Sequence, residues 1–258
     1  MTILELAKVD ANPWGDFHLR GVDFCLSAGA VTGIIGPNGA GKTSLLQLLA
    51  GDVEPSRGDC RLLGTPMSQW DMTERARMMA VLPQLSLLNF PYSVEEVILL
   101  GRTPHGTGAA MDRRILQEVM QATDTTRLRQ RFYTQLSGGE KQRVQLARVF
   151  AQIWQNEGTP RVLLLDEPTT ALDLAHQQLI MASLSLLAAN DCAVVMVAHD
   201  FNLVAGVADQ VVAVAEGQVV AQGTPAEVLT AQLFATVFGA QVTIGAHPVS
   251  GAPLVIQL

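Results

Sequence analysis

Residues 36–43 read GPNGAGKT, a glycine-rich loop that ends in a lysine and a threonine. Residues 30–35, just before it, are short, apolar and rich in β-branched side chains, which predicts a buried strand. Residues 42–50 carry a broad leucine face, which predicts a helix. In such a strand–loop–helix unit the backbone N–H groups surround a phosphate, and the helix N-terminus adds partial positive charge. The stretch therefore predicts a site for a nucleoside triphosphate.

Two side chains of this loop have different predicted roles at the phosphates. Lys42 is placed to reach the β- and γ-phosphates, and Thr43 offers its hydroxyl to Mg²⁺. The predicted phosphate-binding residues are Gly36, Pro37, Asn38, Gly39, Ala40, Gly41, Lys42, Thr43 and Ser44.

A second buried strand, residues 161–166, ends in two adjacent carboxylates. Asp166, at the end of the strand, is predicted to hold Mg²⁺ directly or through water. Glu167 is predicted to act as the general base that polarises the attacking water, a contribution of about 10²–10⁴-fold in rate. Taken without the phosphate loop, the same pair fits a solvated strand end equally well.

The order of predicted elements indicates an α/β fold. Residues 193–198 form another apolar strand, and residues 210–222 read as two short strands around a turn at Glu216 and Gly217. Between residue 84 and about residue 158 the pattern is helical. We therefore predict one domain over residues 1–258, with a core lobe (1–84 and 159–258) and an inserted helical subdomain (85–158).

Composition narrows the class of protein. Hydrophobic residues make up 48% and charged residues 16% of the 258, which is typical of a compact globular chain. No apolar run approaches the roughly 20 residues of a spanning helix, and no secretory signal is recognisable, so a cytoplasmic location is expected. The net charge of −7 disfavours nucleic acid as a partner. Cys25, Cys60 and Cys192 are widely spaced, which predicts reduced structural thiols and no zinc site.

Residues 136–143 read LSGGEKQR, and with this stretch the sequence resembles the ABC ATPase family over essentially its whole length. Gln84 lies where that family has its Q-loop glutamine, and His199 where it has its switch histidine. Residues 169–173, which end in Asp173, resemble the D-loop. The resemblance implies a P-loop NTPase core of the RecA-like type with a helical subdomain, and ATP and Mg²⁺ as ligands.

The resemblance also implies a mechanism in which two subunits form a head-to-tail homodimer. Each ATP would lie between the phosphate loop of one chain and the signature motif of the other. The signature residues are Ser137, Gly138, Gly139 and Glu140. His199 and Gln84 would join Glu167 as catalytic residues, and Thr43, Gln84 and Asp166 would serve Mg²⁺. Ser137 and Glu140 also fit a capping box at a helix start, and the two roles are compatible.

Family members stack an aromatic residue on adenine. Trp14, 22 residues before Gly36, has the best position, with Phe17 as the runner-up. The local match is loose, and packing of Trp14 in the protein interior is the alternative.

The finer resemblance is to the importer branch for iron chelates, cobalamin and haem, and within it to haem-import ATPases. It implies an ATPase coupled to transport, peripheral at the cytoplasmic face of the inner membrane, with two permease subunits and, indirectly, a periplasmic substrate-binding protein. Haem would pass through the permease, so no direct haem binding is expected of this chain. Leu87, Leu88, Phe90 and Tyr92 either form a permease-docking cleft or fill the subdomain core. Ferric siderophore or cobalamin import and a soluble, non-transport ABC ATPase are the alternatives.

Overall fold

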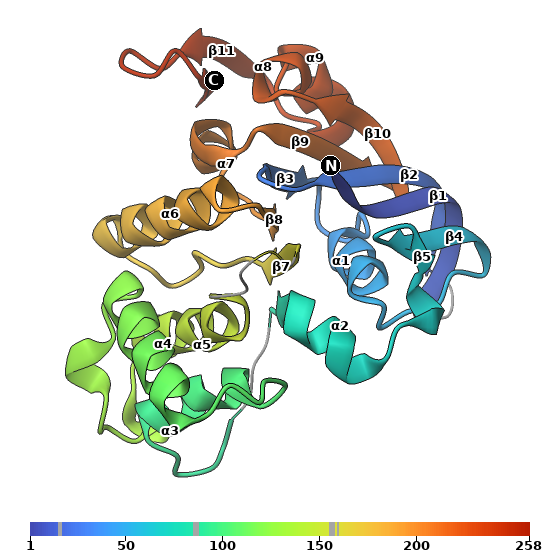
Figure 1. The fold of residues 1–258 in the computed structure, drawn as a ribbon. Coiled ribbons are helices and arrows are strands. Elements are labelled where there is room, and N and C mark those ends of the chain that lie inside the picture. The colour runs from blue at the N-terminus through green and yellow to red at the C-terminus, as the bar shows by residue number, and fades with distance from the viewer. Residues whose placement is uncertain (15–16, 85–87, 155–157, 159) are drawn as a thin grey trace.

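The computed structural model describes residues 1–14, 17–84, 88–154, 158 and 160–258, without the side chains of 13, 14, 17 and 18. Within these residues six strands form the central sheet, in the spatial order β10, β9, β3, β8, β7, β6 (Figure 1). Their bounds are β3 (Val31–Ile35), β6 (Met79–Leu82), β7 (Arg161–Asp166), β8 (Cys192–Val197), β9 (Gln210–Ala215) and β10 (Gln218–Gly223). β10 pairs antiparallel with β9, and the other pairs are parallel.

The predicted strands are confirmed closely. β7 has the predicted bounds, β8 begins one residue before the predicted strand, and β9 and β10 flank the turn at Glu216 and Gly217. β3, β7 and β8 are buried along their whole length. Continuous burial is expected for parallel strands that are covered on both faces, and it explains why these segments are apolar throughout rather than alternating.

A second, antiparallel sheet has the order β2, β1, β4, β5 in the described chain. Its strands are β1 (Thr2–Trp14), β2 (Phe17–Ser27), β4 (Arg57–Leu62) and β5 (Thr65–Pro66). Buried and exposed residues alternate along much of β1 and β2, so that Leu4, Leu6 and Phe24 face the interior. A two-stranded hairpin near the C-terminus, β11 (Val242–Ala246) and β12 (Pro253–Gln257), completes the strands described.

The described helices connect and cover these sheets. The α-helices are α1 (Lys42–Ala50), α2 (Met72–Met78), α3 (Val94–Leu99), α4 (Ala109–Ala122), α5 (Gly138–Ile153), α6 (Leu174–Ala189), α7 (Phe201–Val207), α8 (Pro225–Val228) and α9 (Ala231–Leu233). Short 3₁₀ turns occur at Met67–Gln69, Leu100–Arg102, Thr126–Leu128 and Tyr133–Gln135, and a π turn at Phe234–Phe238. Among them we find no helix with the length and apolar character needed to traverse a bilayer.

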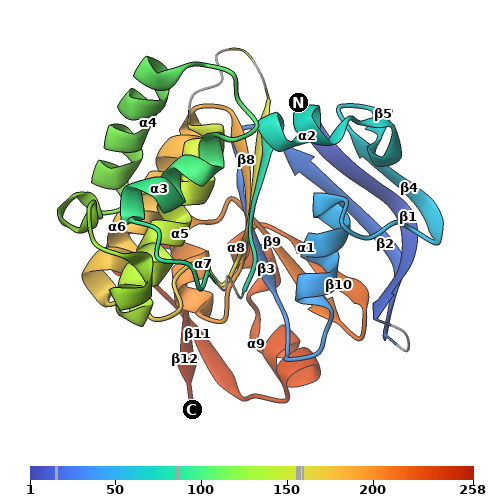
Figure 2. The same cartoon turned by 90° about the horizontal axis from the view of Figure 1, so that it is seen from below.

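Two apolar cores lie on opposite faces of the central sheet. Val162 and Leu164 of β7 join the core shared with α1 and the antiparallel sheet, and α1 lies between the two sheets (Figure 2). Leu163 and Leu165, which point the other way, join the core formed with α5, α6 and α7. The central sheet is thereby covered on both sides, and the ends of its strands are left free to carry polar residues.

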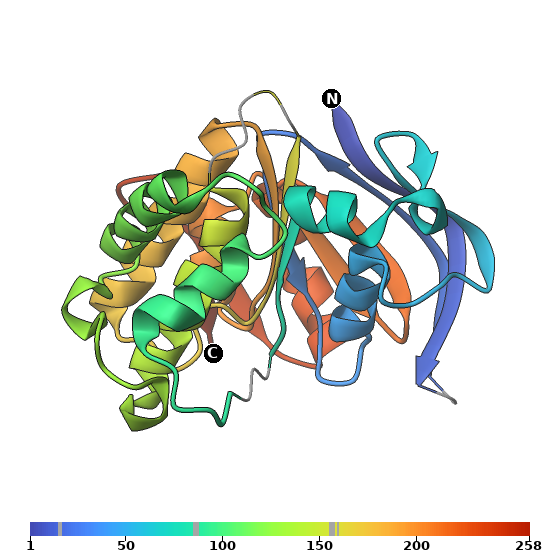
Figure 3. The same cartoon turned by 60° about the horizontal axis from the view of Figure 1, so that its bottom comes forward.

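The helices α3, α4 and α5 pack together beside α6, at the side of the molecule away from the antiparallel sheet (Figure 3). All three fall within the subdomain predicted over residues 85–158. The exact lobe boundaries stay a prediction. The arrangement matters for function because α5 bridges this helical layer and the central sheet.

Candidate functional site

A pocket of about 260 Å³ lies at the carboxyl ends of β3, β7 and β8. It is lined by Asn38, Gly39, Gly41, Lys42, Thr43, Ser44, Gln84, Asp166, Glu167, Val197 and His199. Ligands of open α/β sheets bind at this edge of the strands. A larger hollow of about 790 Å³ is lined in part by Trp154 and Asn190, and its described lining includes none of the residues predicted to act on nucleotide. We therefore place the functional site in the smaller pocket.

The phosphate loop needs glycine at two positions for different reasons. A side chain at Gly36 would collide with the carbonyl oxygen of Val214 on β9, so only glycine fits against that strand. Gly41, the residue before α1, has a φ of 104°, which L-residues with a side chain rarely adopt. Both constraints keep the loop tight and turn the first N–H groups of α1 into the pocket.

Lys42 provides the positive charge of the pocket. Its Nζ donates hydrogen bonds to the carbonyl oxygens of Gly36 and Pro37, each at 2.9 Å. Burial lowers the pKa of Lys42, and the nearby carboxylates of Glu167 and Asp166 act in the opposite direction. A partly desolvated ammonium gains strongly from a nearby phosphate, because charge interactions strengthen as water is excluded.

Asp166 and Thr43 are paired across the pocket. The hydroxyl of Thr43 donates a hydrogen bond of 2.8 Å to Oδ2 of Asp166, whose residue is only 4% exposed. Burial raises the pKa of Asp166, with the hydrogen bond from Thr43 as the largest opposing cause. A buried carboxylate with this character is stabilised by a cation. The two side chains fit Mg²⁺, which takes one or two protein ligands and completes its shell with phosphate and water.

The carboxylate of Glu167 contacts three other side chains. Its Oε1 lies 3.1 Å from Nε2 of Gln84 and 2.8 Å from Nε2 of His199, and its Oε2 accepts a bond of 3.1 Å from the Thr170 hydroxyl. Its backbone φ is 51°, in the left-handed region. Such conformations in a non-glycine residue cost of order 1–3 kcal/mol and are concentrated at functional sites. Two side chains far from Glu167 in sequence, Gln84 and His199, thus converge on one carboxylate together with the neighbouring Thr170.

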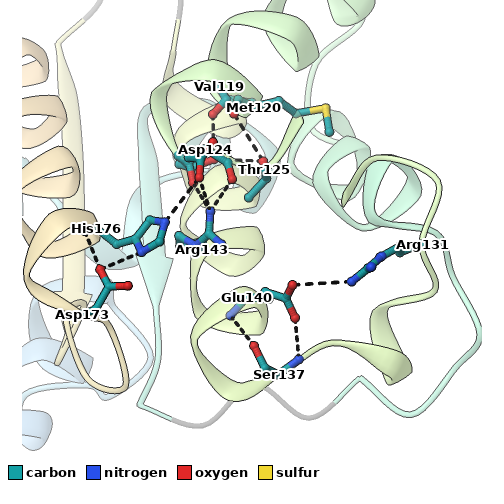
Figure 4. A network of polar contacts seen from close by, with 11 residues as sticks. Val119, Met120, Asp124, Thr125, Arg131, Ser137, Glu140, Arg143, Asp173 and His176 are labelled. Carbon is teal, nitrogen blue, oxygen red and sulfur yellow. Dashed lines mark hydrogen bonds and ion pairs between the residues drawn. The ribbon is translucent and has the colours of Figure 1, made fainter. Parts of the chain in front are cut away.

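The signature residues lie outside this pocket, at the N-terminus of α5. Oε2 of Glu140 accepts the N–H of Ser137 at 2.8 Å, and Oγ of Ser137 accepts the N–H of Glu140 at 3.3 Å. Figure 4 shows this pair together with Arg131, which reaches Glu140 from the side. The capping box anticipated from the sequence is therefore present. A side chain at Gly139 would lie 2.7 Å from the carbonyl oxygen of Ala171, so the helix start is packed directly against the D-loop.

A second network joins the D-loop to the helical layer (Figure 4). Asp173 caps α6 by accepting the N–H of His176 at 2.9 Å, and the His176 ring lies between Oδ1 of Asp173 (2.8 Å) and Oδ2 of Asp124 (3.3 Å). Arg143 of α5 holds Asp124 from the other side at 3.2 Å. Sequence reasoning missed the roles of His176 and Asp124. The spacing of Asp173 and His176 at a helix start indicates a cap, but nothing local indicates Asp124.

Three sequence predictions are only partly addressed by the described residues. The side chain of Trp14, predicted at adenine, and the whole of Leu87 lie outside the described part of the chain. Leu88 packs against the core, whereas Phe90 is 66% and Tyr92 41% exposed. The predicted role of Gln84 at Mg²⁺ stays a prediction, since its described contact is with Glu167.

Fold and pocket together define a P-loop protein that binds a nucleoside triphosphate. Residues 19–170 match the sequence model of the ABC transporter family. The chain belongs to this family as an ATP-binding subunit, an ATPase coupled to transport.

Several relatives cover nearly the whole chain. The hemin import ATP-binding protein HmuV of Gloeobacter violaceus is 45% identical over 99% of this chain and 94% of its own length. HmuV of Pseudomonas entomophila is 47% identical over 98% of this chain and 97% of its own. Among solved structures, a metal-chelate type ABC transporter in an inward-facing conformation is 25% identical and covers 100% of this chain and 97% of that chain, with a TM-score of 0.80.

Proposed function

We propose that this chain powers haem uptake as the ATP-hydrolysing subunit of a bacterial importer. The observation that carries the proposal is the near full-length identity of 44–47% to proteins named for hemin import in several bacteria. No haem ligand is proposed on this chain. In an importer of this kind the cargo passes through the membrane partner, and this subunit supplies the work of ATP hydrolysis.

In the proposed reaction a water molecule attacks the γ-phosphorus of ATP. Glu167 accepts the proton of that water while the new P–O bond forms, the bond from the γ-phosphorus to the bridging oxygen breaks, and ADP leaves. His199 and Gln84 hold the Glu167 carboxylate in place through Oε1. Lys42 and the backbone N–H groups of residues 36–44 neutralise and orient the phosphates. Thr43 and Asp166 would hold Mg²⁺, with Gln84 nearby, and that ion supplies charge neutralisation for the phosphates.

The signature motif is proposed to serve the ATP of a partner copy in a head-to-tail homodimer. Ser137 and the two glycines after it lie at the N-terminus of a helix of 16 residues, outside the pocket of their own chain. Free N–H groups at such a terminus favour an anionic ligand. Asp173 would lie at the same dimer interface.

We further propose that the helical subdomain docks on two membrane permease subunits. The exposed rings of Phe90 and Tyr92, with centroids 6.1 Å apart, form an apolar patch suited to such a partner. The subunit would be peripheral at the cytoplasmic face of the inner membrane and would respond indirectly to a periplasmic substrate-binding protein. Nucleic acid is not a proposed partner.

Growth with haem as the sole iron source tests the cargo. A strain that lacks the gene should fail on haem, grow on inorganic iron, and be rescued by the wild type but not by Glu167→Gln. Growth on haem with failure on a ferric siderophore would assign the cargo to that class instead, and a cobalamin-dependent defect would point to the other alternative.

Purified protein tests the hydrolysis step independently of cargo. Glu167→Gln should lower kcat by about 10²–10⁴-fold and keep ATP binding, because only the general base is lost. Glu54→Gln, an exposed carboxylate away from the pocket, is the matched control and should keep the wild-type rate. Equal rates for the two variants would contradict the proposed role of Glu167.

A further inference from the structure

Gln142 links the signature helix to the backbone of the catalytic loop. It lies on α5, five positions after Ser137, and its Nε2 donates to the carbonyl oxygens of Glu167 at 3.3 Å and Pro168 at 3.1 Å. The side chain is partly buried, so these bonds are shielded from competing water. One amide group from the helical layer therefore holds two successive peptide carbonyls of the loop after β7.

These contacts act where the backbone is under constraint. Glu167 has a φ of 51°, which a residue with a side chain adopts only when its surroundings hold it there. Its N–H is fixed by the carbonyl of Val197 on β8 at 3.1 Å. Its carbonyl is fixed by Gln142 and by the N–H of Thr170 at 3.3 Å. The backbone of Glu167 is thus held by three contacts, which we call the clamp: Val197 from the sheet, Thr170 from the loop and Gln142 from α5.

The direction of the Glu167 side chain depends on this clamp. The contacts of Val197 with the N–H and of Gln142 with the carbonyl hold the two groups on either side of the N–Cα bond of Glu167. Rotation about this bond toward negative φ would pull the carbonyl away from Gln142 and turn the side chain away from Gln84 and His199. The present distances to them, 3.1 and 2.8 Å, occur with the backbone at a φ of 51°. Misplacement of a reacting group by about 1 Å costs on the order of 10²-fold in rate.

We propose that Gln142 is a positioning residue for Glu167, and that it ties the geometry of the general base to the helix that carries the signature motif. The inference rests on the proposed role of Glu167 in hydrolysis. It also predicts that nucleotide held at the N-terminus of α5 acts on the Glu167 of the same chain. Two further contacts join α5 to the segment after β7. Gly139 packs against Ala171. A chain of polar contacts runs from Arg143 through Asp124 and His176 to Asp173 (Figure 4).

The helix offers a matched control for the experiment. Gln152, also on α5, donates through Nε2 to two backbone carbonyls, those of Ala76 at 2.7 Å and Met79 at 2.9 Å, far from the pocket lining. Gln142→Met and Gln152→Met each remove one amide donor and two hydrogen bonds from the same helix. Both should lose similar stability in urea unfolding.

Steady-state ATP hydrolysis separates the two variants. Gln142→Met should lower kcat by about ten-fold or more and leave KM for ATP within about two-fold, because the described side-chain hydrogen bonds of Gln142 go to Glu167 and Pro168 and not to the phosphate loop. Gln152→Met should keep both constants. Equal kcat values for the two variants, or a Gln142→Met effect confined to KM, would overturn the proposal.

Gln142→Glu gives a second test in a side chain of the same size. A carboxylate cannot donate to either carbonyl, whereas its protonated form has one O–H and can restore one of the two bonds. The ratio of its kcat to that of the wild type should therefore rise as pH falls from 8 to 5.5, and a flat ratio would count against positioning. Glu167→Gln is assayed alongside to distinguish failure of the positioning role of Gln142 from failure of the proposed function. If Glu167→Gln hydrolyses ATP at the wild-type rate, the proposed function fails, whatever the result for Gln142.

Discussion

Nε2 of His199, at the end of β8, lies 2.8 Å from Oε1 of Glu167, at the end of the neighbouring strand β7. The same oxygen lies 3.1 Å from the amide nitrogen of Gln84, which follows β6. The three side chains come from successive strands of the sheet order β8, β7, β6. Parallel pairing brings the carboxyl ends of these strands to one edge, and a carboxylate there is held on two sides by its neighbours.

Removal of the His199 ring should therefore impair hydrolysis more than nucleotide binding. We expect His199→Ala to lower kcat by about ten-fold or more, in keeping with the loss of a hydrogen bond to a charged group. His199→Gln, whose amide can still donate, should recover part of the rate. His247→Ala, at the C-terminal hairpin, is the control and should be silent in ATPase assays. A full rate in His199→Ala would refute the role of this contact.

The charge of Asp166 should make the nucleotide-free protein less stable at neutral pH. Because burial raises the folded-state pKa of Asp166, the folded chain disfavours its ionised form, and the cost disappears below the pKa of the unfolded chain, about 3.9. Asp166→Asn should consequently raise the urea midpoint at pH 8 without nucleotide or Mg²⁺, and the gain should shrink toward pH 4.5. The same variant should lose Mg²⁺-dependent ATP hydrolysis. If Asp166→Asn is less stable than the wild type at pH 8, the charge of Asp166 stabilises the folded chain and the prediction is wrong.

Gly139 should not tolerate even a methyl group. A β-carbon at this position would lie 2.7 Å from the Ala171 carbonyl oxygen, which leaves no room for it, and overpacking of this kind costs about 1–3 kcal/mol. We expect Gly139→Ala to lower both the free energy of unfolding and the hydrolysis rate, since the D-loop must shift. Gly106→Ala provides the comparison, because a β-carbon there would have no described atom beyond its chain neighbours within 4 Å. Indistinguishable stability of the two variants would contradict the close packing.

The three thiols should differ sharply in reactivity. Cys25 is exposed and Cys60 and Cys192 are buried. Desolvation raises the pKa of all three, to about 11 for Cys60 and about 12 for Cys192. Since the thiolate is the reactive form, the native protein at pH 8 should titrate one thiol rapidly with a disulfide reagent and all three only after unfolding. Cys25→Ser should abolish the fast phase. Rapid reaction of two or three thiols in the folded protein would show that the interior opens readily.

The sequence was sufficient to predict much of the fold because its signals are local. The loop 36–43 and the strand 161–166 specify their own conformations, and parallel pairing then brings Lys42, Asp166 and Glu167 together without further information. The contacts of Gln142 with the Glu167 and Pro168 carbonyls could not be predicted in this way, since they depend on how α5 packs against the loop after β7. The link from His176 to Asp124 is of the same kind.

The position of β3 in the middle of the central sheet has a consequence for synthesis of the protein. β3 pairs with β8 and β9, whose residues begin at 192 and 210, so the strand that carries the phosphate loop has no partner when it leaves the ribosome. The ribosome needs roughly 8–30 s to add the ~160 residues from 35 to 192, at about 5–20 residues per second. During that time an apolar strand must be shielded by α1, by the N-terminal sheet or by a chaperone. Nascent chains that stop before residue 192 are expected to aggregate and not to bind nucleotide.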